Sequence, residues 1–139
     1  LGRLRLAAML HDLGKVEIVD EILKKTAPLD SREQLVMREH PELGFEMLGE
    51  VRELGDVIDG VRFHHERWDG AGYPCGLKGE GIPLFARIIA VADTYDAMVS
   101  TRPYRKGLGP SVAYDEILKN AGTQFDPRVV IAFGSAFSD

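Results

Sequence analysis

The chain has 139 residues, which fits one domain with its own core, and its content of 45% hydrophobic and 28% charged residues excludes intrinsic disorder. A single cysteine, Cys75, excludes a disulfide framework and a cysteine-based zinc site, and it is typical of a reducing cytoplasmic compartment. The net charge of −5 argues against duplex DNA or RNA as a partner, and there is neither a signal peptide nor an apolar run near the ~20 residues of a membrane span.

The first half of the chain predicts a series of helices, and we expect an all-α fold because no segment alternates with a period of two residues. A mostly buried helix is expected over residues 1–13, with Gly14 as its stop. Asp30 and Glu33 form the pattern of a capping box, which opens a helix that runs toward residue 40. Pro41 can begin the next helix, because proline is favoured in a first helical turn.

The second half continues this pattern around one irregular segment. A helix is expected over about 53–68, followed by a loop over 69–83 that contains five glycines and two prolines. Residues 84–100 form the most apolar predicted helix, and Pro110 and Pro127 each predict the first turn of a later helix. No repeat or linker divides the chain, so we expect one domain over 1–139. Because the chain opens inside a helical pattern without a cap, we expect this domain to be incomplete at its N-terminus.

Histidine is scarce: the four in the chain are His11, His40, His64 and His65, each beside another polar group or a turn. His11 precedes Asp12 at the end of a buried helix, where a charge is costly unless it is paired or bound to a metal. The pair could instead serve only as caps for the helix end. For Lys15, compensation of the helix dipole is the simpler explanation from spacing alone.

The adjacent pair His64 and His65 is a more specific signal. Neighbouring residues of a helix diverge by about 100°, so both rings cannot easily bind one ion from one face, but they can serve two ions. The alternative is one solvent-facing histidine beside a packed one. Asp93 lies in the most apolar helix, where a carboxylate needs a strong partner; a metal would provide one, and a salt bridge to Arg87 is the alternative.

These candidate ligands are imidazoles and carboxylates without a thiolate. Such a set favours iron, manganese or zinc, and more than four ligands favour a multinuclear site. Two ions roughly 3.5–4 Å apart are suited to in-line displacement at phosphorus. The residues alone therefore predict metal-assisted phosphoester hydrolysis.

Two motifs give the chain a family resemblance. The segment from His64 to Pro74 reads HHERWDGAGYP, and residues 11–15 read HDLGK. Together they resemble the HD-GYP family, a branch of the HD metal-dependent phosphohydrolases. The similarity continues through 82–84, 87–93 and 102–105 and ends at 125–127, so that it covers essentially the whole chain.

The resemblance implies an HD-domain helical bundle with a Gly/Pro-rich loop at Gly-Tyr-Pro. It implies a bacterial cyclic-di-GMP phosphodiesterase, which forms linear pGpG or GMP and holds a di- or trinuclear iron or manganese centre. It also implies a sensor or receiver domain in the parent chain and GGDEF-type partner proteins. The metal ligands that it implies are His11, Asp12, His40, His64, His65 and Asp93.

The resemblance assigns further roles around that centre. Asp12 would bridge two ions, and Lys15 would act in catalysis close to the bridging hydroxide and the scissile phosphate. Tyr73 would form the lip of the pocket, where guanine or a partner protein makes contact. Arg102 and Arg105 would lie against the phosphates of the substrate.

One part of the family pattern is missing from the chain. Family members carry a further metal-binding histidine, with a glutamate in trinuclear members, on a helix before the His-Asp dipeptide, but none of the ten residues before His11 is His or Glu. We therefore expect these 139 residues to bind fewer ions than a complete domain and to show little or no activity. Restoring about 30–40 upstream residues should recover both.

Two other functions stay open at this point. A non-catalytic signalling module could bind partners through the Gly-Tyr-Pro loop; the missing upstream ligand favours this reading, whereas the intact ligand set argues against it. An HD phosphohydrolase could also act on another cyclic nucleotide such as cyclic GMP-AMP. The residues that would contact guanine cannot be read from one sequence.

Overall fold

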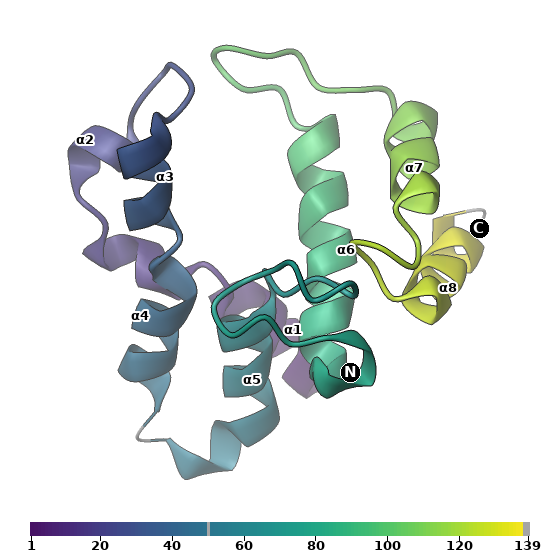
Figure 1. The fold of residues 1–139 in the computed structure, drawn as a ribbon, viewed down its shortest axis with the longest axis horizontal. Coiled ribbons are helices and arrows are strands. Elements are labelled where there is room, and N and C mark those ends of the chain that lie inside the picture. Colours follow the sequence, from purple (N-terminus) through teal and green to yellow (C-terminus); the bar gives the residue numbers. More distant parts are fainter. Residues whose placement is uncertain (50, 138–139) are drawn as a thin grey trace.

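The computed structural model describes residues 1–49 and 51–137, and within these ranges the chain is all-α, as predicted, with no strand. Figure 1 labels the α-helices. They are α1 (Gly2–Leu10), α2 (Asp20–Leu23), α3 (Ser31–Met37), α4 (His40–Leu48), α5 (Gly55–Phe63), α6 (Leu84–Val99), α7 (Pro110–Lys119) and α8 (Pro127–Phe137). Short 3₁₀ helices are η1 (Leu13–Glu17), η2 (Arg52–Leu54) and η3 (Gly79–Gly81). No helix in the described ranges is long and apolar enough to cross a membrane.

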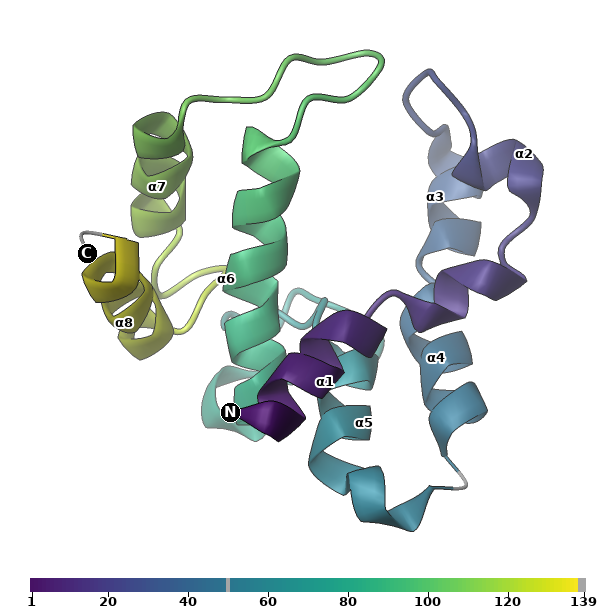
Figure 2. The same cartoon turned by 180° about the vertical axis from the view of Figure 1, so that it is seen from behind.

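The helices form two groups with α5 between them. Helices α2, α3 and α4 lie on one side, and α6, α7 and α8 lie on the other (Figure 1). Seen from behind, α1 crosses α5 and α6, and both of these helices contact it (Figure 2). Helix α5 also packs against α4 and α6, and η1 packs against α4. Segments that are distant in sequence therefore meet where α1, α4, α5 and α6 converge.

Two hydrophobic clusters hold this arrangement. Ala7, Val57 and Ile89 join α1, α5 and α6 and are almost fully buried. A second cluster joins α6 to α7, α8 and the segment between them, and its members are Val91, Ile117, Phe125 and Val130. Helix α6 contributes to both clusters and therefore connects them.

Several local signals in the sequence act as predicted. The Asp30 carboxylate accepts hydrogen bonds from the backbone N–H groups of Arg32 and Glu33, both at 2.9 Å, and the Glu33 side chain accepts from the Asp30 N–H at 2.8 Å. Helices α4, α7 and α8 have a proline in their first turn. The loop after residue 68 is irregular apart from η3, and α6 spans the predicted range to within one residue.

The ends of three helices differ from the prediction. The first helix ends at Leu10 rather than residue 13, and Gly14 lies inside η1 instead of serving as a stop. The helix opened by Asp30 ends at Met37. The helix expected over 53–68 covers only α5, so that its last residue is Phe63. Tertiary packing sets these ends: η1 is pressed against α4, and the chain after α5 turns into the glycine-rich loop.

A buried ion pair fastens α6 to the start of α8. Arg87 Nη1 lies 2.7 Å from Asp126 Oδ2, and the Asp126 side chain is 1% exposed. Burial raises the pKa of Asp126, but hydrogen bonds from Arg128 and Arg87 outweigh it and hold that pKa below its ordinary value. The carboxylate is therefore ionised at neutral pH and depends on these two arginines.

Replacing Arg87 with methionine should lower the free energy of unfolding by about 3 kcal/mol, because it leaves a buried carboxylate with Arg128 alone. Urea unfolding at pH 7 measures the effect. The matched control is Lys119→Met, which breaks an exposed pair with Glu116 at 3.4 Å and should cost less than about 1 kcal/mol. Equal losses of unfolding free energy in the two variants would show that the buried ion pair stabilises the fold no more than the exposed one.

Candidate metal centre

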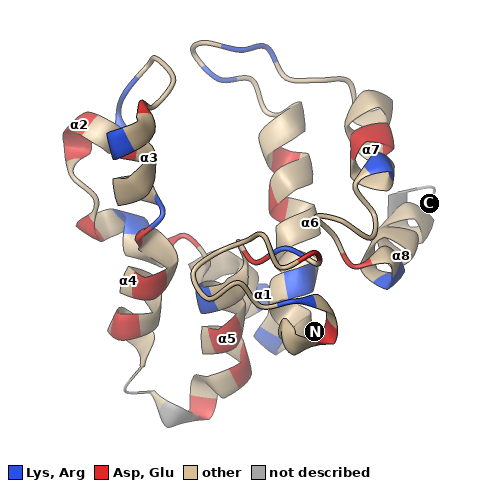
Figure 3. Cartoon of the chain, viewed as in Figure 1, with Lys and Arg blue, Asp and Glu red and all other residues tan. Residues whose placement is uncertain are grey.

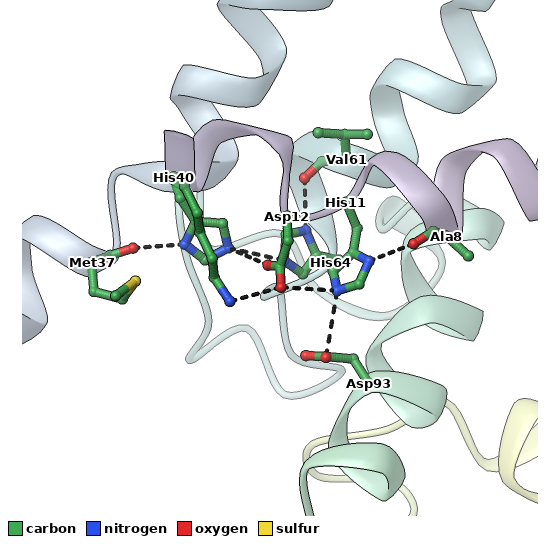
Figure 4. A network of polar contacts seen from close by, with 9 residues as sticks. Ala8, His11, Asp12, Met37, His40, Val61, His64 and Asp93 are labelled. Carbon is green, nitrogen blue, oxygen red and sulfur yellow. Dashed lines mark hydrogen bonds and ion pairs between the residues drawn. The ribbon is translucent and has the colours of Figure 1, made fainter. Parts of the chain in front are cut away.

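The predicted ligands come from four short segments that meet where α1, α4, α5 and α6 converge, and Figure 4 shows five of the six residues. His11 follows the last residue of α1, and Asp12 precedes η1. His40 begins α4, and Asp93 lies in the middle of α6. His64 and His65 occupy the turn after α5, and His64 keeps right-handed helical backbone angles. Both rings nevertheless offer an atom to one group with His40, and whether they serve one ion or two stays a prediction.

Three of the histidines are oriented by backbone carbonyls. The Nδ1 atoms of His11, His40 and His64 lie 2.6, 2.6 and 2.7 Å from carbonyl oxygens three residues earlier in the chain. A proton on each Nδ1 is required for these hydrogen bonds, so each Nε2 carries a lone pair that faces the centre. This is the usual arrangement of a metal-binding histidine, in which the outer hydrogen bond sets the tautomer and the ring orientation.

The inner nitrogens of these three histidines are turned toward the centre. His11 Nε2 is buried without a hydrogen-bond partner, and His40 Nε2 lies 3.2 Å from His64 Nε2, so that two lone pairs face each other. Two imidazoles bound to one ion at about 2.1 Å would be separated by about 3 Å when they meet at a right angle. The donor geometry therefore fits a metal ion, which removes the repulsion between the lone pairs.

The ligand atoms form two groups that share one residue. His40, His64 and His65 offer atoms that lie within 4.8 Å of one another. The same limit holds for His11, Asp12 and His64. The shared His64 ring is 2% exposed and has its neighbours on both sides. Because His64 Nδ1 faces the Val61 carbonyl, only its Nε2 can bind an ion, so His64 can serve either group but not both. The two overlapping groups can together hold more than one ion.

Both carboxylates face His11, and Asp12 also faces His40. Asp12 Oδ1 lies 3.3 Å from His40 Nε2, and Asp12 Oδ2 lies 3.5 Å from His11 Nε2, as expected of a carboxylate that spans two ions. Asp93 Oδ1 lies 3.4 Å from His11 Nε2. The alternative partner of Asp93, Arg87, is bonded to Asp126 instead, so that alternative is wrong.

The charge states suit metal binding, which requires deprotonated ligands. Burial, together with the neighbouring rings, lowers the pKa of His64 to about 3 and that of His65 to about 4. Burial raises the pKa of Asp12, but His40 and Lys15 outweigh it and hold that pKa far below its ordinary value. Near pH 7, His64 and His65 are thus neutral and Asp12 is ionised. Burial lowers the pKa of His11, but hydrogen bonds to Asp93 and the Ala8 carbonyl outweigh it and hold that pKa above its ordinary value, so a metal ion must displace a proton there.

The residues predicted around the ligands divide into two sets. Lys15 Nζ lies 2.7 Å from Asp12 Oδ2, and the Tyr73 ring stacks on His65 at 4.8 Å and 14°, so both belong to the centre. Arg102 and Arg105 lie in the basic loop after α6 (Figure 3), and Arg105 Nη2 donates to the Ala97 carbonyl at 2.5 Å. No contact within the described ranges joins these two arginines to the ligands, and their role at the substrate stays a prediction.

Glu66 supports the site and was not among the predicted residues. It is 3% exposed, and its two oxygens accept the backbone N–H groups of Cys75 and Leu77 at 2.7 and 2.9 Å. The loop also passes close to the backbone of residues 65–67, because a Cβ atom at Gly72 would lie 2.4 Å from the Arg67 nitrogen. These contacts hold the glycine-rich loop beside His65. The place of Glu66 directly after the histidine pair was a signal that could have identified it.

Gly14 controls how closely η1 approaches α4. A Cβ atom there would lie 1.9 Å from the His40 carbonyl oxygen and 2.5 Å from the Gly44 nitrogen, and backbone atoms cannot move aside cheaply. Gly14→Ala should push Asp12 away from His40 and lower metal affinity by about 10- to 100-fold, as when a supporting residue of a metal site is lost.

The effect of Gly14→Ala is measured by metal titration of the variant and by its circular dichroism. Gly81→Ala is the control, because a Cβ atom at that position meets nothing within 4 Å. Unchanged metal affinity in Gly14→Ala would show that the contact between η1 and α4 does not position Asp12.

Comparison with known proteins agrees with this geometry. Residues 1–129 match the family model described as HD domain. The cyclic di-GMP phosphodiesterase response regulator RpfG of Xanthomonas campestris pv. campestris is 45% identical over 133 residues, which cover 93% of this chain and 35% of the relative. The 3'3'-cGAMP-specific phosphodiesterase 2 of Vibrio cholerae is 40% identical over 126 residues, which cover 89% of this chain and 24% of the relative.

A solved structure shares the fold. The crystal structure of a cyclic GMP-AMP specific phosphodiesterase of V. cholerae, V-cGAP3, aligns with a TM-score of 0.69 at 22% identity. The alignment covers 99% of this chain and 38% of that one. The chain thus spans between 24% and 38% of the length of these proteins.

Proposed function

The chain belongs to the HD domain family and carries the motifs of its HD-GYP branch, and from this premise we propose that it hydrolyses cyclic-di-GMP to linear pGpG or GMP. The observation that carries the proposal is the pair of overlapping ligand groups, each of which contains His64. Histidines that turn their inner nitrogens toward one another, with His11 Nε2 buried and without a hydrogen-bond partner, have no evident use in a docking module, so catalysis is favoured over the non-catalytic alternative.

The residues that would hold the metal are His11, Asp12, His40, His64, His65 and Asp93. A centre bound there would neutralise phosphate charge and supply a water-derived nucleophile at neutral pH. Asp12 would join the two ligand groups, because one of its oxygens faces His40 and the other faces His11. Lys15, which lies beside the same carboxylate, would oppose charge on a non-bridging oxygen, where a positioned donor contributes about 3–4 kcal/mol.

We further propose iron or manganese as the metal, in a centre of at least two ions. Imidazole and carboxylate donors without a thiolate favour iron, manganese or zinc, and the resemblance to the HD-GYP branch selects iron or manganese among them. The two overlapping ligand groups support neighbouring ions. A ligand from outside residues 1–139 would complete the family pattern. The free and exposed Cys75 fits a reducing cytoplasm.

A second substrate is supported by one specific observation. A relative named as specific for 3'3'-cGAMP is 40% identical, close to the values for the cyclic di-GMP phosphodiesterases. Both substrates are cyclic dinucleotides with two phosphodiesters, so the same centre would serve either. The choice between them depends on contacts to the bases.

The test is to load the full-length protein with Mn²⁺ or, without oxygen, Fe²⁺, and to measure kcat/KM for cyclic-di-GMP and 3'3'-cGAMP. We expect both to be hydrolysed and cyclic-di-GMP to be preferred by at least about 10-fold, equivalent to about 1.4 kcal/mol. A chelator-treated sample is the control and should be inactive. Preference for 3'3'-cGAMP would select the second substrate, and no turnover of either by metal-loaded protein would overturn the enzymatic proposal.

A further inference from the structure

Arg38 lies close to the centre but belongs to none of the motifs that identify it. It caps the C-terminal end of α3, two residues before His40. Its guanidinium carbon lies 5.0 Å from the centre of the Tyr73 ring, within the range of a cation–π contact. The same ring stacks on His65. One aromatic side chain therefore connects Arg38 to a metal ligand.

The guanidinium of Arg38 has no carboxylate partner among residues 1–49 and 51–137. The neighbouring cations are already engaged, since Lys15 pairs with Asp12 and Arg67 pairs with Asp69 at 2.8 Å. Arginine carries five N–H donors in a rigid fork that matches the oxygens of a phosphate. The donors of Arg38 are thus available to an anionic ligand, whereas those of its neighbours are committed.

A cavity of about 190 Å³ lies between Arg38 and the ligands. Arg38 and Tyr73 line one part of it, and His65 and Asp93 line another. Pockets that enclose a whole small molecule measure about 300–1,000 Å³, so this one suits a phosphate and its adjoining sugar better than a guanine nucleotide. The group that enters it must face the metal ligands and Arg38 together.

We propose that Arg38 binds the non-bridging oxygens of the substrate phosphodiester at the metal centre, with Tyr73 as the residue that positions its guanidinium. This inference rests on the proposed function and adds a binding residue to it. Bidentate contact with a phosphate is a charge-assisted interaction, stronger than a neutral hydrogen bond and directional. The cation–π contact fixes the plane of the guanidinium before the substrate arrives, which lowers the entropic cost of binding.

The test compares Arg38→Ala and Arg38→Lys on cyclic-di-GMP and on bis(4-nitrophenyl) phosphate, a phosphodiester without a base. Loss of a hydrogen bond to a charged group corresponds to about a 10- to 100-fold decrease in kcat/KM, which we expect on both substrates for Arg38→Ala. Arg38→Lys, which keeps the charge but loses the fork, should fall between Arg38→Ala and the wild type. Arg32→Ala is the control, because Arg32 lies at the opposite, N-terminal end of α3, and it should change kcat/KM by less than twofold.

The bound metal is counted in every variant and should not change. A decrease of kcat/KM on cyclic-di-GMP alone would show that Arg38 contacts the base. An unchanged kcat/KM on both substrates would show that Arg38 contacts neither. Either result overturns the proposal and leaves the proposed function intact. Loss of metal in Arg38→Ala would overturn it as well, because the effect would then be structural.

Binding of inorganic phosphate to the metal-loaded protein, measured by calorimetry, tests Arg38 without turnover. It should weaken by a similar factor in Arg38→Ala and stay unchanged in Arg32→Ala. If the wild type hydrolyses neither substrate, the proposed function fails and this binding measurement alone decides the role of Arg38.

Discussion

Replacing Asp12 with alanine should reduce kcat/KM for cyclic-di-GMP by at least about 1,000-fold, equivalent to about 4 kcal/mol of lost transition-state stabilisation. The reason is that its two oxygens face His40 and His11, which belong to different ligand groups. Loss of this carboxylate therefore weakens metal binding at both groups at once. It also releases Lys15 from the only ion pair that it makes among the described residues.

The measurement is a metal count by mass spectrometry with turnover on the same samples. Asp12→Asn is a second variant, because it keeps the shape of the side chain and removes only the charge. Asp115→Ala, on the exposed face of α7, is the matched control and should behave as the wild type. Normal metal content and turnover in Asp12→Ala would show that Asp12 is not a ligand.

Replacing His64 with alanine should remove a donor from whichever of the two ligand groups its single free Nε2 serves. His11→Ala and His65→Ala also affect a single group each, so each of these three variants should retain part of the metal, whereas Asp12→Ala should retain the least. We expect the affinity of His64→Ala to fall beyond the roughly 10- to 100-fold that accompanies loss of a supporting residue. Asp93→Asn should also lose metal and turnover, since Asp93 faces His11.

The graded loss is measured by titrating each metal-free variant with Mn²⁺. Circular dichroism should show the helical fold retained in all of them, because the hydrophobic clusters that hold α5 and α6 do not include these side chains. If His64→Ala keeps as much metal as the wild type, His64 is not a ligand.

The sequence predicts much of this architecture, because the signals involved are local. The capping box of Asp30 and the first-turn prolines require only a few neighbouring residues, and each acts as expected. The apolar run of α6 is likewise a local pattern that long-range contacts reinforce. The predicted ligand set could be named from its motifs, and the structure brings these six residues together although the first and the last, His11 and Asp93, are 82 residues apart in the chain.

What the sequence does not predict depends on contacts between distant segments. The position of η1 follows from the packing of Gly14 against His40 and Gly44, which no local pattern reveals. The end of α5 at Phe63 places the histidine pair on the turn that follows the helix, five residues before the predicted helix end. The partner of Arg87 is 39 residues away, and Arg38 meets Tyr73 only because the glycine-rich loop folds back over His65.

The most direct test is to titrate the metal-free, full-length protein with Mn²⁺ and to follow bound ions and cyclic-di-GMP turnover in the same samples. We predict that at least two ions bind for each chain, that turnover rises with their occupancy, and that a chelator removes both. Turnover by metal-free protein, or two bound ions without hydrolysis of any cyclic dinucleotide, would contradict the assignment of this His/Asp cluster as a phosphodiesterase centre.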